Sequence, residues 1–177
     1  PPTAKFCMQC GAAQTGSPGA GETSAGVSAR RMTSVLFGDL VGFTTLSESR
    51  DHEEVREILA EYFEECRIII DRYGGAVEKF IGDAVMAVWG VPVAHEDDAE
   101  RAVRAGLELA DALAALGDRV GVEGLAMRVG IVTGEVAVTV GARGQGMVAG
   151  DPVNTAARVQ STAAPGQVWV DETTRIL

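Results

Sequence analysis

The spacing of apolar residues predicts a strand followed by a long helix in the first part of the chain. A short apolar run from Met32 to Phe37 is typical of a central strand covered on both faces. From Val55 to Tyr73 the apolar residues recur at steps of three and four, so they share one face of a helix. The other face is acidic, which indicates a solvated surface and not a metal cluster.

The remaining chain predicts further strands and helices. In chain order these are strands at 76–81 and 84–89 around the turn Gly82-Asp83, a helix at about 99–114, strands at 125–132 and 136–140, a helix at about 151–161, a strand at 167–170 and the start of a helix at 171–177. Asp151 is the expected N-cap of its helix, with Pro152 at the first helical position. This order predicts an α+β fold with a ferredoxin-like split β-α-β core.

Charge and composition exclude several classes of protein. The chain has 177 residues, 46% of them hydrophobic, and a net charge of -10. Such acidity disfavours a sequence-independent nucleic-acid surface, and an anionic nucleotide would need divalent cations as intermediaries. No segment holds some twenty uninterrupted apolar residues, so we expect no membrane contact from this segment. Three cysteines, an odd number, argue for a reducing compartment, and we expect a cytoplasmic location.

The first 29 residues differ from the rest. Cys7 and Cys10 form a C-x-x-C-G turn, which is one edge of a zinc site that needs two further ligands. Either residues 1–11 are the remnant of a zinc ribbon, or they are a tail without metal. Zn²⁺ binding is expected only if the full ribbon is present. Residues 12–29 are mostly small and polar and are expected to form a flexible linker, which leaves 30–177 as the domain.

Two carboxylates and one cation are candidates for chemistry. Asp39 ends the first predicted strand, just before the small-residue turn at 41–44, while Asp83 and Lys79 lie on the predicted hairpin. Hydrated magnesium prefers one or two carboxylates plus substrate phosphates, so these positions indicate a metal-nucleotide site. Taken singly, each aspartate would be an ordinary cap or turn residue. It is their joint spacing that favours the site.

One helix also carries two polar candidates. Asn154 and Arg158 are four residues apart and therefore share one face of the helix predicted at 151–161. Cys66 lies inside the apolar stripe of the first helix and is interpreted as a core residue, not a nucleophile.

Four motifs occur in an order that resembles a known family. They are FGDLVGFT at 37–44, EKFIGD at 78–83, MRVGI at 127–131 and GDPVNTAAR at 150–158. Together they are similar to the catalytic domain of class III adenylyl and guanylyl cyclases, over residues 30–177. The resemblance implies conversion of ATP to 3',5'-cyclic AMP and pyrophosphate, with two Mg²⁺ or Mn²⁺ ions per active site.

The resemblance also implies roles for residues. Asp39, Asp83 and the carbonyl of Leu40 match the metal ligands. Four positions match groups that hold phosphates: the turn residues Gly42, Phe43 and Thr44, and Arg128. Asn154 and Arg158 match the catalytic pair that orients the ribose and stabilises charge on the α-phosphate. In the family these groups come from two domains, so the resemblance implies a homodimer, an inactive monomer, and attached regulatory domains in the parent protein.

Two positions in the family select the purine. Lys79 matches the lysine of adenylyl cyclases. The second position is Met147, where the family normally has Asp or Thr, and a thioether is a weak acceptor for the adenine amino group. Relatives also continue past Leu177 with a phosphate-binding lysine, so the domain is interpreted as C-terminally truncated.

Three alternatives therefore stay open. The first is a guanylyl cyclase, and the second is a catalytically weak or degenerate cyclase-like module that binds nucleotide or dimerises to regulate attached domains. The third is a zinc-ribbon interaction protein.

Overall fold

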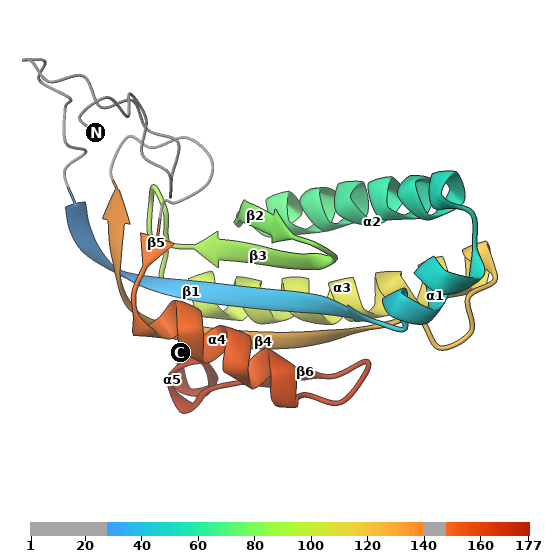
Figure 1. Ribbon diagram of the computed structural model, residues 1–177. Helices are drawn as coiled ribbons and strands as arrows, with labels where there is room; N and C mark the ends of the chain where they lie inside the picture. The colour runs from blue at the N-terminus through green and yellow to red at the C-terminus, as the bar shows by residue number, and fades with distance from the viewer. Residues whose placement is uncertain (1–27, 140–147) are drawn as a thin grey trace, which may run out of the picture.

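The computed structural model describes residues 28–139 and 148–177 and is built on one twisted sheet (Figure 1). Its central strand β1 (Ser28–Val41) lies between β3 (Ala84–Trp89) and β4 (Ala126–Thr139), and β2 (Ala76–Ile81) forms the edge beside β3. All these pairs are antiparallel. On its other side β4 pairs with two short strands, antiparallel with β5 (Val148–Ala149) and parallel with β6 (Val168–Val170). The order β2-β3-β1-β4 confirms the predicted α+β fold with a split β-α-β core.

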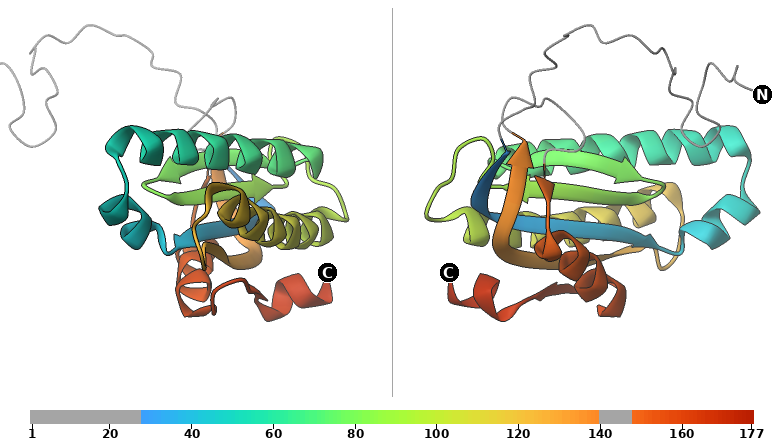
Figure 2. Two further views of the ribbon diagram at one scale, coloured as in Figure 1. Left: turned by 90° about the vertical axis from the view of Figure 1, so that its right-hand side faces the viewer. Right: turned by 60° about the vertical axis from the view of Figure 1, so that its left-hand side comes forward.

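Helices cover the two faces of the sheet unequally. Figures 1 and 2 show α3 (Asp98–Val120) and α4 (Asp151–Thr162) on opposite faces. The long helix α2 (His52–Arg72) packs against α3, and it follows the short helix α1 (Phe43–Ser49) in the chain. The last helix is α5 (Glu172–Ile176). In the part of the chain that the structure describes, no helix has the length and apolarity needed to span a bilayer.

Alternation along β1 divides the core into two layers. Leu36 and Leu40 point to the side of α2 and α3, where Tyr62 and Cys66 are also wholly buried. Val35 and Phe37 point to the opposite side, which α4 covers through Ala156. Asp39 therefore lies on the α4 side of the sheet, because it continues the row of Val35 and Phe37.

The fourth strand corrects one prediction. The two strands expected at 125–132 and 136–140 are one continuous strand, β4, whose Thr133 and Gly134 pair with Ser34 and Thr33 of β1. Thr133 is tolerated inside the sheet because its hydroxyl lies 2.8 Å from that of Ser34 and 2.9 Å from that of Thr174. Hydrogen-bond partners distant in sequence thus override a local turn signal.

The start of α4 corrects a second prediction. Asp151 is the first residue of the helix and Gly150 is its N-cap, with a φ of 152° that favours glycine. The N-cap is therefore Gly150, one residue before the predicted Asp151. Pro152 is in the first turn, as its missing N–H permits.

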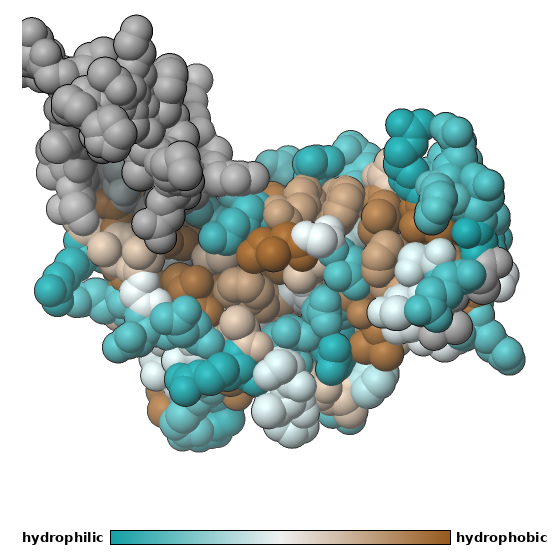
Figure 3. Space-filling model, viewed as in Figure 1, coloured by the Kyte–Doolittle hydropathy of each residue, from teal (hydrophilic) through white to brown (hydrophobic). Residues whose placement is uncertain are grey.

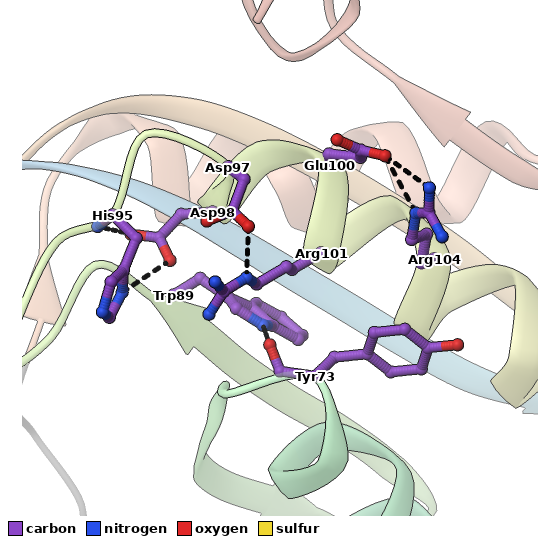
Figure 4. Close-up of polar contacts among 8 residues, drawn as sticks. All are labelled: Tyr73, Trp89, His95, Asp97, Asp98, Glu100, Arg101 and Arg104. Atoms are coloured by element: carbon purple, nitrogen blue, oxygen red, sulfur yellow. Dashed lines mark hydrogen bonds and ion pairs between the residues drawn. The ribbon is translucent and has the colours of Figure 1, made fainter.

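Polar contacts fix the entry to α3 (Figure 4). The indole of Trp89, wholly buried, donates from Nε1 to the carbonyl of Tyr73 at 3.0 Å. The carboxylate of Asp98 accepts from the backbone N–H of His95 at 2.7 Å, which closes the loop before the helix. On the surface of α3, Arg101 contacts Asp97 at 2.8 Å. These bonds serve the fold, since they lie at the end of β3, the end of α2 and the start of α3 and involve none of the predicted site residues.

Candidate active site

Asp39 and Asp83 lie at the same end of two neighbouring strands. The pairing of β1 with β3 reaches Gly38 and Val85. Asp39 is the next residue of β1, two residues before the strand ends at Val41, and Asp83 precedes β3 in the β2–β3 turn. Burial raises the pKa of Asp83 and the negative charge of Asp39 raises it further, whereas a hydrogen bond from its own backbone and the charge of Arg128 lower it. The carboxylate of Asp83 therefore lies within range of the negative charge of Asp39.

A tyrosine holds the turn that carries Asp83. The Tyr62 hydroxyl donates to the backbone carbonyl of Asp83 at 3.0 Å. Burial raises the pKa of Tyr62 well above its usual value, so the hydroxyl keeps its proton and remains a donor. The sequence placed Tyr62 only in the apolar stripe of a helix. Its need for a buried hydrogen-bond acceptor was the signal that could have indicated a further role.

Replacing Tyr62 by phenylalanine is expected to lower turnover about tenfold, because the carbonyl of Asp83 loses its donor and the turn loosens. Metal titrations of the initial rate should show that half-saturation moves to higher concentration. Tyr73→Phe is the matched control. The Tyr73 hydroxyl donates to Glu108 at 2.8 Å and makes no hydrogen bond to the turn that carries Asp83. Equal effects of the two substitutions on metal dependence would contradict a positioning role for Tyr62.

Arg128 lies directly opposite Asp39 on the neighbouring strand. The two residues are register partners between β1 and β4, and Nη2 of Arg128 donates to Oδ2 of Asp39 at 2.9 Å. Their side chains are 31% and 27% exposed, so the pair is partly desolvated. The family resemblance implied a phosphate-binding role for Arg128, and nothing in the sequence indicated that it lies beside a predicted metal ligand.

The turn after β1 contains a glycine in the left-handed region of the backbone map. Gly42 has a φ of 90°, a conformation that side-chain-bearing residues rarely adopt, and α1 begins at the next residue, Phe43. The side chain of Leu40 is 6% exposed and belongs to the core, which leaves its main chain as the part that could face a ligand. Thr44 is exposed in the first turn of α1.

Lys79 lies on the same face of the sheet as Asp39, but two strands away and at a different position along them. Lys79 pairs with Met86, and Met86 pairs with Phe37, so the three side chains form one row across β2, β3 and β1. Asp39 lies two residues beyond Phe37. With strands about 4.8 Å apart and a rise of about 3.3 Å per residue, the Cα atoms of Lys79 and Asp39 are about 12 Å apart. At this separation, and among the residues that the structure describes, Lys79 forms no ion pair with Asp39, whose partner is Arg128.

Asn154 and Arg158 lie exposed on α4. The helix packs on the sheet through the buried residues Ala156 and Gln160, which leaves the two candidates free to face outward. Arg158 donates to the Thr155 hydroxyl at 3.2 Å. Within residues 28–139 and 148–177, no hydrogen bond or ion pair joins Asn154 or Arg158 to the aspartates.

The donor set of this end of the sheet suits a hard divalent cation. Two carboxylates supply oxygen ligands, and the described residues contain no group of three or more His, Cys, Asp or Glu side chains that could form a closed protein cage. Magnesium and manganese fit such a site, because they keep waters and phosphate oxygens among their ligands. Cys66, by contrast, is wholly buried, and burial raises the pKa of its thiol to about 12, which agrees with a core role.

Three predicted positions lie outside the described residues. They are Met147 and the cysteine pair Cys7 and Cys10. The purine-selecting role of Met147, the zinc site and the boundaries of the N-terminal tail and linker therefore stay predictions.

Comparison with known proteins places the chain. A model of the adenylate and guanylate cyclase catalytic domain matches residues 27–177. Adenylate cyclase 1 of Rhizobium meliloti is 38% identical over 74% of this chain, and an adenylate cyclase of Mycobacterium bovis is 35% identical over 78%. These matches span only 21% and 32% of the two relatives' own lengths.

Solved structures agree with the sequence relatives. The guanylyl cyclase Cya2 is 38% identical with a TM-score of 0.75, covering 82% of this chain and 77% of that one. The adenylyl cyclase CyaB from P. aeruginosa is 32% identical with a TM-score of 0.78, covering 85% and 81%. The chain therefore belongs to the adenylate and guanylate cyclase catalytic domain family and is a class III nucleotidyl cyclase domain.

Proposed function

We propose that two copies of this chain form an adenylyl cyclase that converts ATP to 3',5'-cyclic AMP and pyrophosphate. The observation that carries the proposal is the meeting of Asp39 and Asp83 at one end of β1 and β3. Lys79, Asn154 and Arg158 are the remaining candidates, and within the described residues none of them forms a hydrogen bond or ion pair with either aspartate. A second copy related by a two-fold axis is the simplest way to complete the site.

Apolar surface supports a second copy as the partner. Figure 3 shows apolar side chains across the middle of the face that carries α4, over β3 and β1. Phe37 and Ala76 are partly buried on this side and pack against the smaller core layer. This area adjoins the row of Lys79, so a copy that packs here would also bring its own charged groups to the site.

The chemistry forms one bond and breaks another. The ribose 3'-oxygen attacks the α-phosphorus, its proton is released, and the bond between the α-phosphorus and the bridging oxygen breaks to give pyrophosphate. Asp39, Asp83 and the Leu40 carbonyl would hold Mg²⁺ or Mn²⁺, which when bound lowers the pKa of the attacking hydroxyl and neutralises charge on the leaving group.

The chain's own polar groups position the nucleotide. The 42–44 turn and Arg128 bind the phosphates of the leaving group, and Asn154 orients the ribose. The guanidinium of Arg158 stabilises the charge that develops on the α-phosphate, and a fixed donor of this kind contributes about 3 kcal/mol to lowering a barrier. In the single chain this guanidinium donates to the Thr155 hydroxyl at 3.2 Å.

Lys79 favours adenine as the base, whereas guanylyl cyclases commonly have an acidic residue at this position. A guanylyl cyclase is the second candidate, because the Cya2 structure is as similar in sequence as the adenylate cyclase relatives. Purified protein with Mn²⁺ and either ATP or GTP distinguishes them when the cyclic product is separated and quantified. Faster formation of cyclic GMP would overturn the choice of ATP, and no product from either would favour the degenerate module.

Mixing two inactive variants tests the shared site. Asp39→Asn removes a metal ligand and Arg158→Ala removes a positioning cation, so each homodimer should be inactive. Random pairing of equal amounts gives half heterodimers, each with one intact site, and about a quarter of the wild-type rate should return. The rate of cyclic nucleotide formation before and after mixing measures this. A mixture as inactive as its components would place both residues in the same chain's site.

A further inference from the structure

The ion pair between Arg128 and Asp39 places a protein cation on a carboxylate that the proposed function assigns to metal. Oδ2 of Asp39 already accepts a hydrogen bond from Arg128 at 2.9 Å. The pKa of Asp83, which burial raises, is raised further by the negative charge of Asp39 and lowered by the positive charge of Arg128. Arg128, anchored on β4, therefore supplies a positive charge at this end of the sheet.

The positive charge of Arg128 weakens the binding of a free divalent cation to the two aspartates. Two aspartates and one arginine leave a net charge of -1, which attracts a divalent ion less than two bare carboxylates would. A guanidinium about 6 Å from a divalent ion opposes its binding by about tenfold even with the dielectric screening of water. Since the pair is only about a third exposed, screening here is weaker than in water and the opposition is larger.

Not all hydrogen-bond donors of Arg128 have an acceptor in this position. Among the described residues its Nε–H is buried and has no hydrogen-bond partner. A guanidinium can form two parallel bonds with a phosphate, and this geometry would satisfy more of its donors than the single bond to Asp39 does. An incoming anionic phosphate therefore offers Arg128 a better partner and frees the oxygen of Asp39.

We propose that Arg128 is a competing counter-ion of Asp39, so that the protein binds a bare divalent cation poorly and takes up the cation together with a phosphate group. The proposal rests on the assignment of Asp39 to metal in the proposed function. It adds a sequence of events to that function: the metal binds Asp39 when Arg128 has moved from Asp39 to the substrate's phosphates.

Binding of Mn²⁺ without nucleotide tests the competition directly. The electron paramagnetic resonance signal of free Mn²⁺ gives the dissociation constant for the wild type, Arg128→Gln and Arg128→Lys. Arg128→Gln, which removes the charge, is expected to bind bare Mn²⁺ at least about tenfold more tightly. Arg128→Lys keeps the charge and should stay within about threefold of the wild type. Unchanged or weaker binding by the glutamine variant would overturn the proposal and leave the pair a simple clamp on Asp39.

Two controls keep the result interpretable. Arg128→Gln combined with Asp39→Asn should lose the gained affinity, and tight binding that survives in the double variant would overturn the proposal by placing the metal elsewhere. If Arg128→Gln does not melt like the wild type, Arg128→Met replaces it under the same criterion.

The second half of the proposal is tested with 2',3'-dideoxy-ATP, which lacks the attacking hydroxyl. The gain in Mn²⁺ affinity on adding the analogue should be at least about tenfold larger in the wild type than in Arg128→Gln. Direct contact between Mn²⁺ and phosphate occurs in both proteins and cancels in this ratio. Equal gains would overturn the coupling. Because no step needs turnover, a protein that shows the coupling without forming cyclic nucleotide would refute the proposed function alone.

Discussion

Asp39→Asn is expected to slow cyclic nucleotide formation at least a hundredfold, or about 3 kcal/mol of transition-state stabilisation. The amide keeps the shape of the side chain but removes the charge that would hold a divalent cation. Initial rates with saturating Mn²⁺ and ATP measure the effect. The fold should survive, because the amide keeps the shape of the side chain and its oxygen can still accept the hydrogen bond from Arg128.

Glu135→Gln is the matched control for this substitution. Glu135 also lies on β4 opposite β1 and contacts Arg30 at 2.9 Å, but its side chain is 57% exposed and lies at the other end of the strand pair. Its rate should stay near that of the wild type. A wild-type rate for Asp39→Asn would show that metal binds elsewhere, and an equal loss in Glu135→Gln would show that any loss of charge on these strands acts indirectly.

Gly130→Ala is expected to destabilise the protein by about 3 kcal/mol and to lower its activity as well. A Cβ atom at Gly130 would lie 2.3 Å from the backbone nitrogen of Gln160 and 2.6 Å from the carbonyl oxygen of Ala156. Both atoms belong to the backbone of α4, which cannot move aside without shifting the whole helix. Such a shift would carry Asn154 and Arg158 with it.

Thermal unfolding followed by circular dichroism measures the loss, and about 3 kcal/mol corresponds to a melting temperature lower by about 10 °C in a domain of this size. Gly38→Ala is the control on the facing strand. Its Cβ would meet side-chain atoms of Met127 and Val85 at 3.0 to 3.2 Å, and these can adjust. We expect about 1 kcal/mol there. Similar losses for both glycines would mean that α4 is not packed on β4 as described.

Local signals were sufficient for the hairpin and for most of the long helices, although α3 runs on to Val120, beyond its predicted end near residue 114. Strands predicted at 76–81 and 84–89 coincide with β2 and β3, since a short apolar run on either side of Gly82-Asp83 leaves few other structures. The periodicity from Val55 likewise predicted α2. It missed only the first turn, which is polar and begins after the Asp51 cap.

Non-local partners decided where prediction failed. Thr133 and Gly134 were predicted to link two strands, yet both lie inside β4. The reason is that β1, with 14 residues, pairs with β4 on both sides of them. The two-residue strand β5 has too few positions for any periodic pattern and exists only through its pairing with β4.

The sequence by itself determined which residues are candidates for chemistry, because motif order and spacing are properties of the chain. Asp39, Asp83, Lys79, Asn154 and Arg158 could all be named without coordinates. Only the tertiary structure decided that the two aspartates meet, that Arg128 binds Asp39, that Tyr62 holds the Asp83 turn and that Lys79 stands apart. The physical reason is that strand register sets these distances, and register depends on pairing between segments up to about a hundred residues apart.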